Sequence, residues 1–398
     1  MPFFAVYLES RGVDYSVIGL TYLFAGLLLL LGVVLSGRLT DSFGPRRVLL
    51  ISYSFAFVSS LVLGYLVYTS AEVSWLLVLY PIFYLMRSFS QPATSAMIAN
   101  QRESHMRTGF SLSYVAGNLG FAIGPAIGGI LAQYYGYSTV FLLSAGTAVA
   151  VAVITVMEVR GGLLVPTERP DGGFLATKGK TVNRWLSWKN DRNVILFLVL
   201  VMCSFIAVGY EITPLSVYVA GFLNFSNEQI GYLFATNGLV IVILQLPLTN
   251  LTTRMRSLVL PMMLSSVFAT TAFLIAAVST NFLQWELVMF TVTLAEIFQA
   301  VPSQTVVALF SRAGNRGTYQ GYYNAFTGAG RSIASFVGPA TFGLLALTPY
   351  LSWVVIAVFS LVVGFGFILL SPNLNRDYSA MKAGAQANGN LEEPITEI

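Results

Sequence analysis

Four ionisable side chains lie inside long apolar stretches of the sequence, where charges are rare. They are Arg87, Glu211, Glu296 and Arg331. A charge at bilayer depth costs about 2.5–3.5 kcal/mol, so such residues usually face a cavity or a partner. Desolvation favours the protonated form of a carboxylate, so we expect Glu211 or Glu296 to exchange a proton and Arg87 to gate or to bind an anionic group. The alternative is a structural ion pair between Arg87 and a glutamate.

Polar side chains recur around these charges at helical spacing, which puts each set on one face of a helix. The sets are Tyr80, Tyr84, Arg87 and Gln91; Thr293, Glu296, Gln299 and Ser303; and Asn324, Thr327, Arg331 and Ser335. Each pattern indicates a helix with one face lining a water-filled cavity. The aromatic side chains of Tyr80, Tyr84, Tyr210 and Phe298 would suit an amphipathic organic compound on that wall.

The elements that carry these residues are predicted membrane helices. Of the 398 residues, 56% are hydrophobic and only 10% charged, and a helix of about 20 apolar residues crosses the hydrocarbon core. Eleven such runs are present, at residues 16–36, 48–68, 74–99, 108–133, 138–157, 194–222, 228–248, 258–278, 285–310, 318–347 and 352–370. The apolar residues 1–8 resemble the outer end of a truncated first helix, and we expect the gene product to start upstream.

Basic residues set the predicted orientation, since loops rich in Lys and Arg stay cytoplasmic. One set of loops holds nearly all of them, and the other set holds Arg11 alone. We therefore expect a multi-pass protein of the plasma membrane. Its predicted parts are a first transmembrane half (1–157), a cytoplasmic linker (158–192), a second half (193–371) and a disordered cytoplasmic tail (372–398).

Two motifs of small and charged residues stand out. The stretch 37–47 reads GRLTDSFGPRR, in which Gly44 permits a tight turn and Asp41 can pair with Arg46 or with a helix end. It predicts either a conformational latch or a loop that only sets the topology. The second motif consists of Gly120, Gly124, Pro125, Gly128 and Gly129. Its small residues let helices approach closely, and its proline can kink one.

The two halves show weak internal similarity. A shift of 212 positions places Gly26-Leu27 on Gly238-Leu239, and a shift of 214 places residues 124–126 on 338–340. Such repeats occur in secondary transporters. The chain resembles the major facilitator superfamily, whose loop signature matches at Gly37, Leu39, Asp41, Gly44 and Arg46 but departs at Ser42 and Pro45.

The resemblance implies an all-α integral membrane fold of two parallel six-helix bundles, here with the first helix truncated and about eleven complete spans. It also implies that the first, fourth, seventh and tenth spans line the cavity, and that the stretch 37–47 holds the halves together on the cytoplasmic side. The glycine motif is similar to one that is frequent in proton-driven exporters of this family.

We therefore expect a secondary active transporter that moves a small organic solute by alternating access, with proton-coupled export. The alternatives are an uptake carrier for an organic anion or sugar, bound through Arg87 and Arg331, and a transport-dead sensor on the same fold. A membrane enzyme is the weaker competitor, because Cys203 and His105 are single residues of their types and predict neither a metal site nor a nucleophilic triad. The expected partners are the solute, protons and membrane lipids around a monomer, with no cofactor and no nucleic acid.

Overall fold

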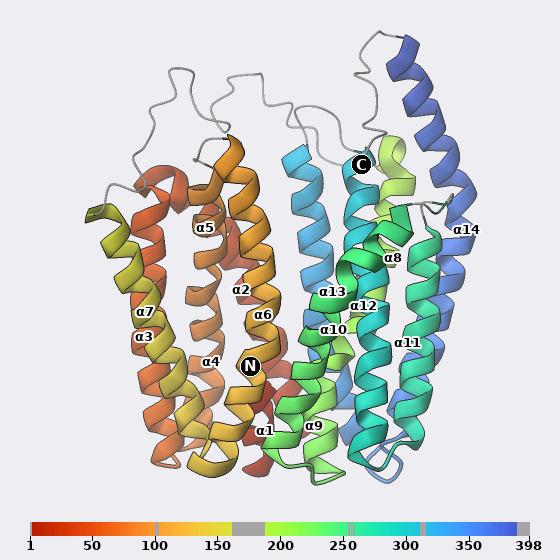
Figure 1. The fold of residues 1–398 in the computed structure, drawn as a ribbon. Coiled ribbons are helices and arrows are strands. Elements are labelled where there is room, and N and C mark those ends of the chain that lie inside the picture. Colours follow the sequence, from red (N-terminus) through yellow and green to blue (C-terminus); the bar gives the residue numbers. More distant parts are fainter. Residues whose placement is uncertain are drawn as a thin grey trace.

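The chain folds into long helices that run roughly parallel to one another (Figure 1). The computed structural model describes residues 2–99, 103–160, 188–253, 259–310 and 316–387, together with Met255 and Ser257. The helices are α1 (Pro2–Ser10), α2 (Tyr15–Phe43), α3 (Pro45–Tyr68), α4 (Val73–Ser88), α5 (Ser90–Ala99), α6 (Glu103–Tyr135), α7 (Tyr137–Arg160), α8 (Trp188–Val208), the 3-10 turn η1 (Gly209–Glu211), α9 (Thr213–Gly221), α10 (Asn227–Thr253), α11 (Leu260–Val278), α12 (Phe282–Phe310), α13 (Arg316–Leu344) and α14 (Leu351–Ala387).

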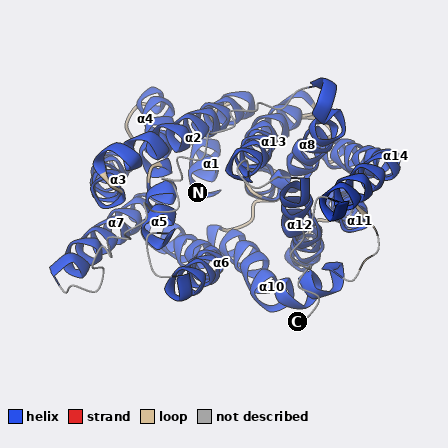
Figure 2. Ribbon diagram, turned by 90° about the horizontal axis from the view of Figure 1, so that it is seen from above, coloured by secondary structure: helices blue, strands red, loops and turns tan. Residues whose placement is uncertain are grey.

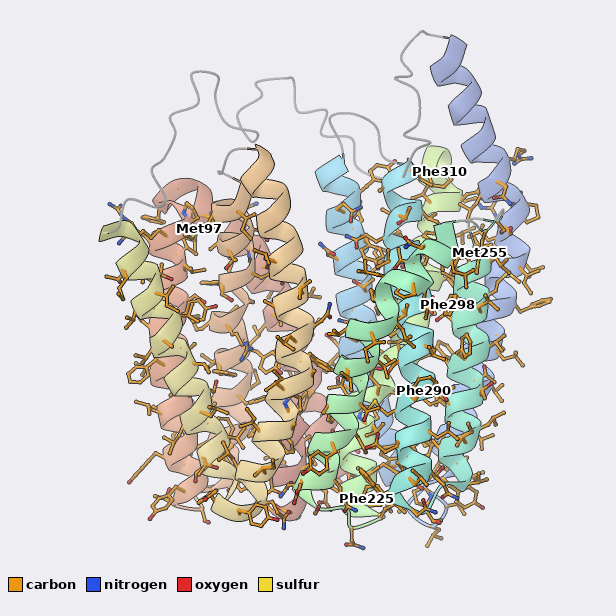
Figure 3. The ribbon with its side chains drawn as sticks, viewed as in Figure 1. Met97, Phe225, Met255, Phe290, Phe298 and Phe310 are labelled. Carbon is orange, nitrogen blue, oxygen red and sulfur yellow. The ribbon has the colours of Figure 1, made fainter. Side chains whose placement is uncertain are left out.

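The two ends of the bundle are distinguished by their loops. Met97 and Phe310 lie near one end, which also holds the turn between α2 and α3 and which we call the basic end (Figure 3). Phe225 lies at the other end, called here the opposite end. The loops rich in basic residues are predicted to lie at the former.

Helices α1 to α7 form one half of the molecule and α8 to α14 the other, and the two halves stand side by side (Figure 2). The halves meet where α2 packs on α13 and α6 packs on α10. A core cluster of the second half also takes in Phe3, Val6, Ala132 and Val140 from the first half. Residues from both halves therefore share one packed core.

Local sequence signals account for the start of α2 and for the turn that follows it. The Asp14 side chain accepts a hydrogen bond of 2.8 Å from the Ser16 backbone N–H, which caps the helix. Gly44 separates α2 from α3 with a φ of 82°, a conformation open to glycine, and Pro45 follows at the first position of α3. The predicted tight turn at Gly44 is confirmed.

The all-helical membrane fold is confirmed, with differences in detail. Ten helices of the described part are long and apolar enough to cross a membrane. The predicted run 318–347 falls on α13, which has 29 residues but is richer in polar and small side chains. The runs 74–99 and 194–222 are each interrupted, the first at Phe89 and the second between Val208 and Thr213.

The predicted tail begins at residue 372, and helix α14 continues through Pro372 to Ala387 in that region. Residues 388–398 lie outside the described part. Most of the predicted linker does too, since α7 reaches Arg160 and α8 begins at Trp188.

Candidate functional site

Five polar residues of the second half come together between the helices. The Asn237 amide nitrogen on α10 lies 2.9 Å from the Thr293 hydroxyl oxygen on α12. The same nitrogen lies 3.5 Å from a carboxylate oxygen of Glu211 and 3.5 Å from one of Glu296. Arg331 on α13 forms an ion pair of 3.1 Å with the other oxygen of Glu296. We call these five residues the polar cluster.

Burial differs across the polar cluster. Glu211 is 3% exposed and Asn237 is 1% exposed, whereas the Arg331 side chain is 46% exposed. Glu296 has its negative charge offset by the Arg331 guanidinium, which also lies 5.1 Å from the centroid of the Phe205 ring. Glu211 is therefore the deeper of the two carboxylates, and Glu296 holds the direct ion pair.

A break in the seventh span positions Glu211. Helix α8 ends at Val208, η1 carries Glu211, and α9 starts afresh with Pro214 in its first turn. Gly209 permits this break to lie against α13, because a Cβ atom there would be 2.7 Å from the Ala334 Cβ and 3.3 Å from the Arg331 Cα. Discontinuous helices of this kind bring backbone and side-chain groups to ion and solute sites in transporters.

A second set of polar residues continues along α12 toward the basic end. Gln299 lies one turn from Glu296 and is fully buried, and neither atom of its amide group has a hydrogen-bond partner among the described residues. Farther along, the Ser303 and Tyr323 hydroxyl groups are 3.1 Å apart, and Tyr323 also donates to the Ala300 carbonyl at 2.9 Å. The predicted polar face of this helix is thus buried rather than exposed at Gln299 and Ser303.

In the first half, the predicted cavity residues of the fourth span separate into two groups. Tyr80 is fully buried, stacks on Phe4 with 3.8 Å between ring centroids, and lies 5.0 Å from the Tyr84 ring. Arg87 and Gln91 are exposed. The first group is an aromatic core within its own half, whereas the second is accessible.

The alternative of an ion pair between Arg87 and a glutamate is not what the structure shows. Within the described part of the chain Arg87 has no acidic partner, and Glu296 instead pairs with Arg331 of its own half. The reason is topological, since α12 and α13 pack together in the second half while α4 belongs to the first. The predicted residues Glu296 and Arg331 are thus brought together, and Arg87 is not part of that group.

The glycine motif of α6 lies at the contact between the halves, with its members in different roles. A Cβ atom at Gly129 would collide with the Asn227 carbonyl oxygen and lie 3.1 Å from the Gly231 Cα, and a Cβ at Gly128 would lie 3.1 Å from the Phe3 ring. A Cβ atom at Gly120 or at Gly124 would have no neighbour within 4 Å among the described residues.

Helices α2 and α13 approach one another in the same way. A Cβ atom at Gly19 would lie 2.8 Å from the Phe336 carbonyl oxygen, and one at Gly26 would collide with Ser332. Toward the basic end of α2, Gly37 has open space among the described residues. The close contacts of both helix pairs therefore lie toward the opposite end.

Hydrogen bonds between the halves add to this closure at the opposite end. Tyr137 donates to the Asn227 side-chain oxygen at 3.0 Å, and the Asn227 backbone N–H donates to Gln133 at 3.1 Å. Tyr134 donates to Glu228 at 3.1 Å. The start of α10 is thereby tied to the end of α6 and the start of α7.

The predicted latch at residues 37–47 stays a prediction. The Asp41 side chain lies outside the described residues. The Arg46 Nε is buried and has no hydrogen-bond partner among the described atoms.

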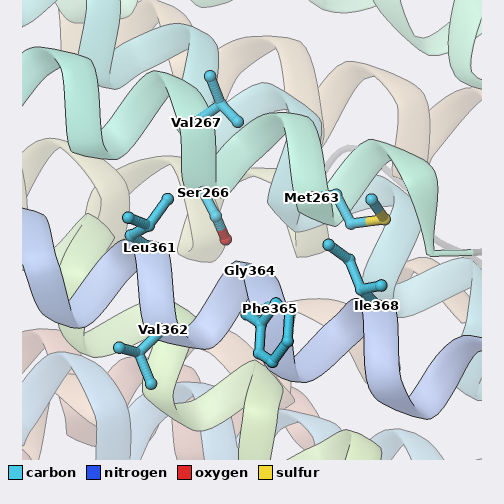
Figure 4. A pocket seen from close by; sticks show the side chains of 8 residues that line it. All are labelled: Met263, Ser266, Val267, Leu361, Val362, Gly364, Phe365 and Ile368. Carbon is cyan, nitrogen blue, oxygen red and sulfur yellow. The ribbon is translucent and has the colours of Figure 1, made fainter.

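An apolar cavity of about 490 Å³ lies between α11 and α14 (Figure 4). Its lining is Met263, Ser266, Val267, Leu361, Val362, Gly364, Phe365 and Ile368. None of the predicted site residues is among them. The cavity is therefore separate from the polar cluster.

Two residues of these groups were not predicted from the sequence. Asn237 belongs to the polar cluster, and Tyr22 belongs to the aromatic core around Tyr80. An asparagine inside the apolar run 228–248 was a usable signal for the first, because an amide in hydrocarbon needs a partner. Tyr22, with its ring centroid 5.3 Å from that of Tyr80, gave no comparable signal.

The family is decided by comparison with known sequences. Residues 1–335 match the family model described as Major Facilitator Superfamily. The chain belongs to the major facilitator superfamily. It is therefore a multi-pass membrane protein of a family of secondary transporters of small molecules, and not an enzyme.

Two curated relatives of this superfamily member are described as multidrug resistance proteins. It is 32% identical over 170 residues to a "Multi-drug resistance efflux pump PmrA homolog" of Lactococcus lactis, covering 40% of this chain and 39% of that protein. It is 24% identical over 367 residues to "Multidrug resistance protein 2" of Bacillus subtilis, covering 87% and 84%. The chain thus spans about two fifths of the first relative's length and most of the second's.

Solved transporter structures share the fold. A peptide transporter POT with bound alafosfalin gives a TM-score of 0.73 at 16% identity, with 92% of this chain and 87% of that chain covered. The nucleoside transporter NupG gives a TM-score of 0.70 at 15% identity, with 93% of each chain covered. At these identities the likeness shows the fold alone.

Proposed function

We propose that this transporter exports lipophilic organic cations in exchange for protons, and that Glu211 carries the coupling proton. The observation behind the assignment is the contrast between two carboxylates. Glu296 is held by Arg331 at 3.1 Å, whereas Glu211 is 3% exposed and contacts the neutral Asn237 amide. A buried carboxylate without a direct cationic partner is the one that gains most from binding a proton.

The proposed cycle follows from this charge balance. When Glu211 is ionised, the polar cluster carries one net negative charge, which an organic cation offsets. When Glu211 takes up a proton, the cluster is neutral and the cation loses its counter-charge. Competition of this kind couples the export of one charge to the entry of another. The descriptions of two relatives as multidrug resistance proteins, one of them an efflux pump, support the export direction.

The uptake of an organic anion is less well supported. It would use Arg87 and Arg331 together, but Arg331 is already engaged by Glu296. A doubly charged anion would have to displace that carboxylate. In the first half, exposed Arg87 alone remains available to bind an anionic group.

The test uses the full chain in liposomes with an acidic lumen and radiolabelled tetraphenylphosphonium outside. Molecules whose basic end faces outward should accumulate the cation as protons leave the lumen. Glu211→Gln should abolish this accumulation. It should keep counterflow exchange at equal pH only at raised cation concentrations, because exchange needs no net proton movement but the variant lacks the negative charge that favours cation binding. Glu286→Gln is the matched control, since Glu286 is another glutamate on α12 but does not belong to the polar cluster.

Glu296→Gln gives the complementary result. It removes the partner of Arg331, so driven accumulation and exchange should fall together. Accumulation that persists in Glu211→Gln would contradict the proton assignment. Wild-type protein that moves no cation under a pH gradient would contradict the proposed export.

A further inference from the structure

A half-buried carboxyl group lies where the two halves meet at the opposite end. Glu9 is near the end of α1, and α1 packs on α9 of the second half (Figure 1). A Cβ atom at Gly221, the last residue of α9, would be 2.8 Å from a Glu9 carboxylate oxygen and 2.6 Å from the Tyr15 hydroxyl oxygen. The side chains of Glu9 and Tyr15 therefore cover the end of α9 from the first half.

Two tyrosines connect this carboxyl group to the second half. The Tyr15 ring stacks on Phe222, with 5.4 Å between the ring centroids. Tyr137 of α7 donates to Asn227 of α10. Both tyrosines lie close enough to Glu9 to interact with its charge. Glu9 is thus part of the contact between the halves.

No cation offsets the charge of Glu9 among the described residues. Arg11, two residues along the chain, is engaged elsewhere, since it donates to the Tyr7 hydroxyl at 2.7 Å and to the Ser70 carbonyl at 3.3 Å. The titratable groups near this contact on the elements around α1 are Asp14 before α2, Tyr15 of α2, Tyr134 of α6, Tyr137 of α7, Tyr218 of α9 and Glu228 of α10. None of them carries a positive charge, and tyrosine does not ionise near neutral pH.

The proton affinity of Glu9 therefore depends on the conformation. Burial without a counter-charge raises the pKa of Glu9 while the halves are in contact. When the opposite end opens, α1 and α9 separate, water reaches the carboxyl group, and its pKa falls toward the ordinary value. The closed conformation binds the proton more tightly. Acid therefore favours closure, and a rise of pH through the raised pKa favours opening.

We propose that Glu9 is a proton-controlled gate, whose protonated carboxyl group lets the halves close at the opposite end and whose ionisation separates them. The inference goes beyond the proposed function, because Glu9 belongs to the first half and lies outside the polar cluster. Under the proposed exchange, protons enter from the opposite end. The acidic medium that loads Glu211 would then also favour closure of the molecule over it.

The experiment measures the distance between spin labels at Tyr68 and Leu283 in the purified full-length protein, in which Cys203 is replaced by serine. Every sample also carries Glu211→Gln, so that the proposed coupling site does not contribute to the pH response. A change from about pH 8 to about pH 5 should raise the ratio of closed to open molecules about three-fold or more, because this ratio changes by up to the ratio of the two proton affinities.

Glu9→Gln should abolish this response and keep the closed conformation at both pH values, because glutamine is a neutral side chain of nearly the same shape. Glu286→Gln is the matched control and should leave the response unchanged. Glu286 is also a partly buried glutamate, but its neighbour is Thr236 of its own half. A response of the same size with and without Glu9→Gln would overturn the gate, as would an open conformation of Glu9→Gln at both pH values.

Failure of this inference is distinct from failure of the proposed function. Wild type that accumulates the cation under a pH gradient, together with no Glu9-dependent change in label distance, would overturn the gate alone. A Glu9-dependent change in a protein that accumulates no cation would support the gate and contradict the proposed exchange. Thermal unfolding of each variant checks that a lost pH response is not loss of the fold.

Discussion

The glycine contacts toward the opposite end predict where the addition of one methyl group changes the balance between conformations of the transport cycle. Gly129→Ala places a Cβ against the Asn227 carbonyl oxygen and 3.1 Å from the Gly231 Cα, and both neighbours are backbone atoms that cannot rotate away. Overpacking of this kind costs about 1–3 kcal/mol. The cost applies only to the conformation in which α6 and α10 are in contact. The population of that conformation should therefore fall by about 5- to 150-fold relative to the one open at the opposite end.

Gly120→Ala is the control, because Gly120 belongs to the same motif and the same helix but has no described atom within 4 Å of its Cβ position. Alanine there should stabilise the helix by at most about 1 kcal/mol and leave the equilibrium unchanged. The assay is the distance between spin labels at Tyr68 and Leu283, which are each 79% exposed and lie at the opposite end of the two halves. Cys203 is first replaced by serine so that only these positions are labelled.

Gly129→Ala should add a population with a longer label distance, and Gly120→Ala should not. An unchanged distance distribution in Gly129→Ala would refute the argument that these contacts belong to one conformation. The same shift in both variants would also refute it, since a Cβ atom at Gly120 clashes with no described atom.

Two further predictions concern single polar groups. Tyr137→Phe removes the 3.0 Å hydrogen bond to the Asn227 side chain. The population ratio of the two conformations, measured with the same labels, should shift in the same direction by about five-fold, which corresponds to about 1 kcal/mol. An unchanged distance between labels at Tyr68 and Leu283 would contradict this, because it would mean that wild type makes the bond in both conformations. Asp41→Asn should slow counterflow exchange while leaving the thermal unfolding temperature unchanged, because the proposed latch forms in only one of two states. Wild-type exchange in that variant would reduce the stretch to a topology signal.

Much of the fold can be predicted from the sequence. Apolar runs long enough to cross a membrane predict the positions of most helices, and Gly44 followed by Pro45 predicts the turn that the structure contains. Periodicity also identifies Glu296 as a residue of a polar face. These features are local, because helix length, turn geometry and the cost of a charge in hydrocarbon depend on a few neighbouring residues.

The partners of these residues were decided by packing alone. Periodicity gives the face of a helix but not its rotation toward other helices, so it could not choose between Arg87 and Arg331 as the partner of Glu296. The break at Gly209–Glu211 likewise depends on α13 lying against it. The same holds for the glycine motif. Gly129 and Gly120 are both glycines of that motif, and only the structure shows that their neighbours differ. Only the tertiary structure brings α10 to Gly129 and Asn237 to the two glutamates, since these contacts join residues that are far apart in the chain.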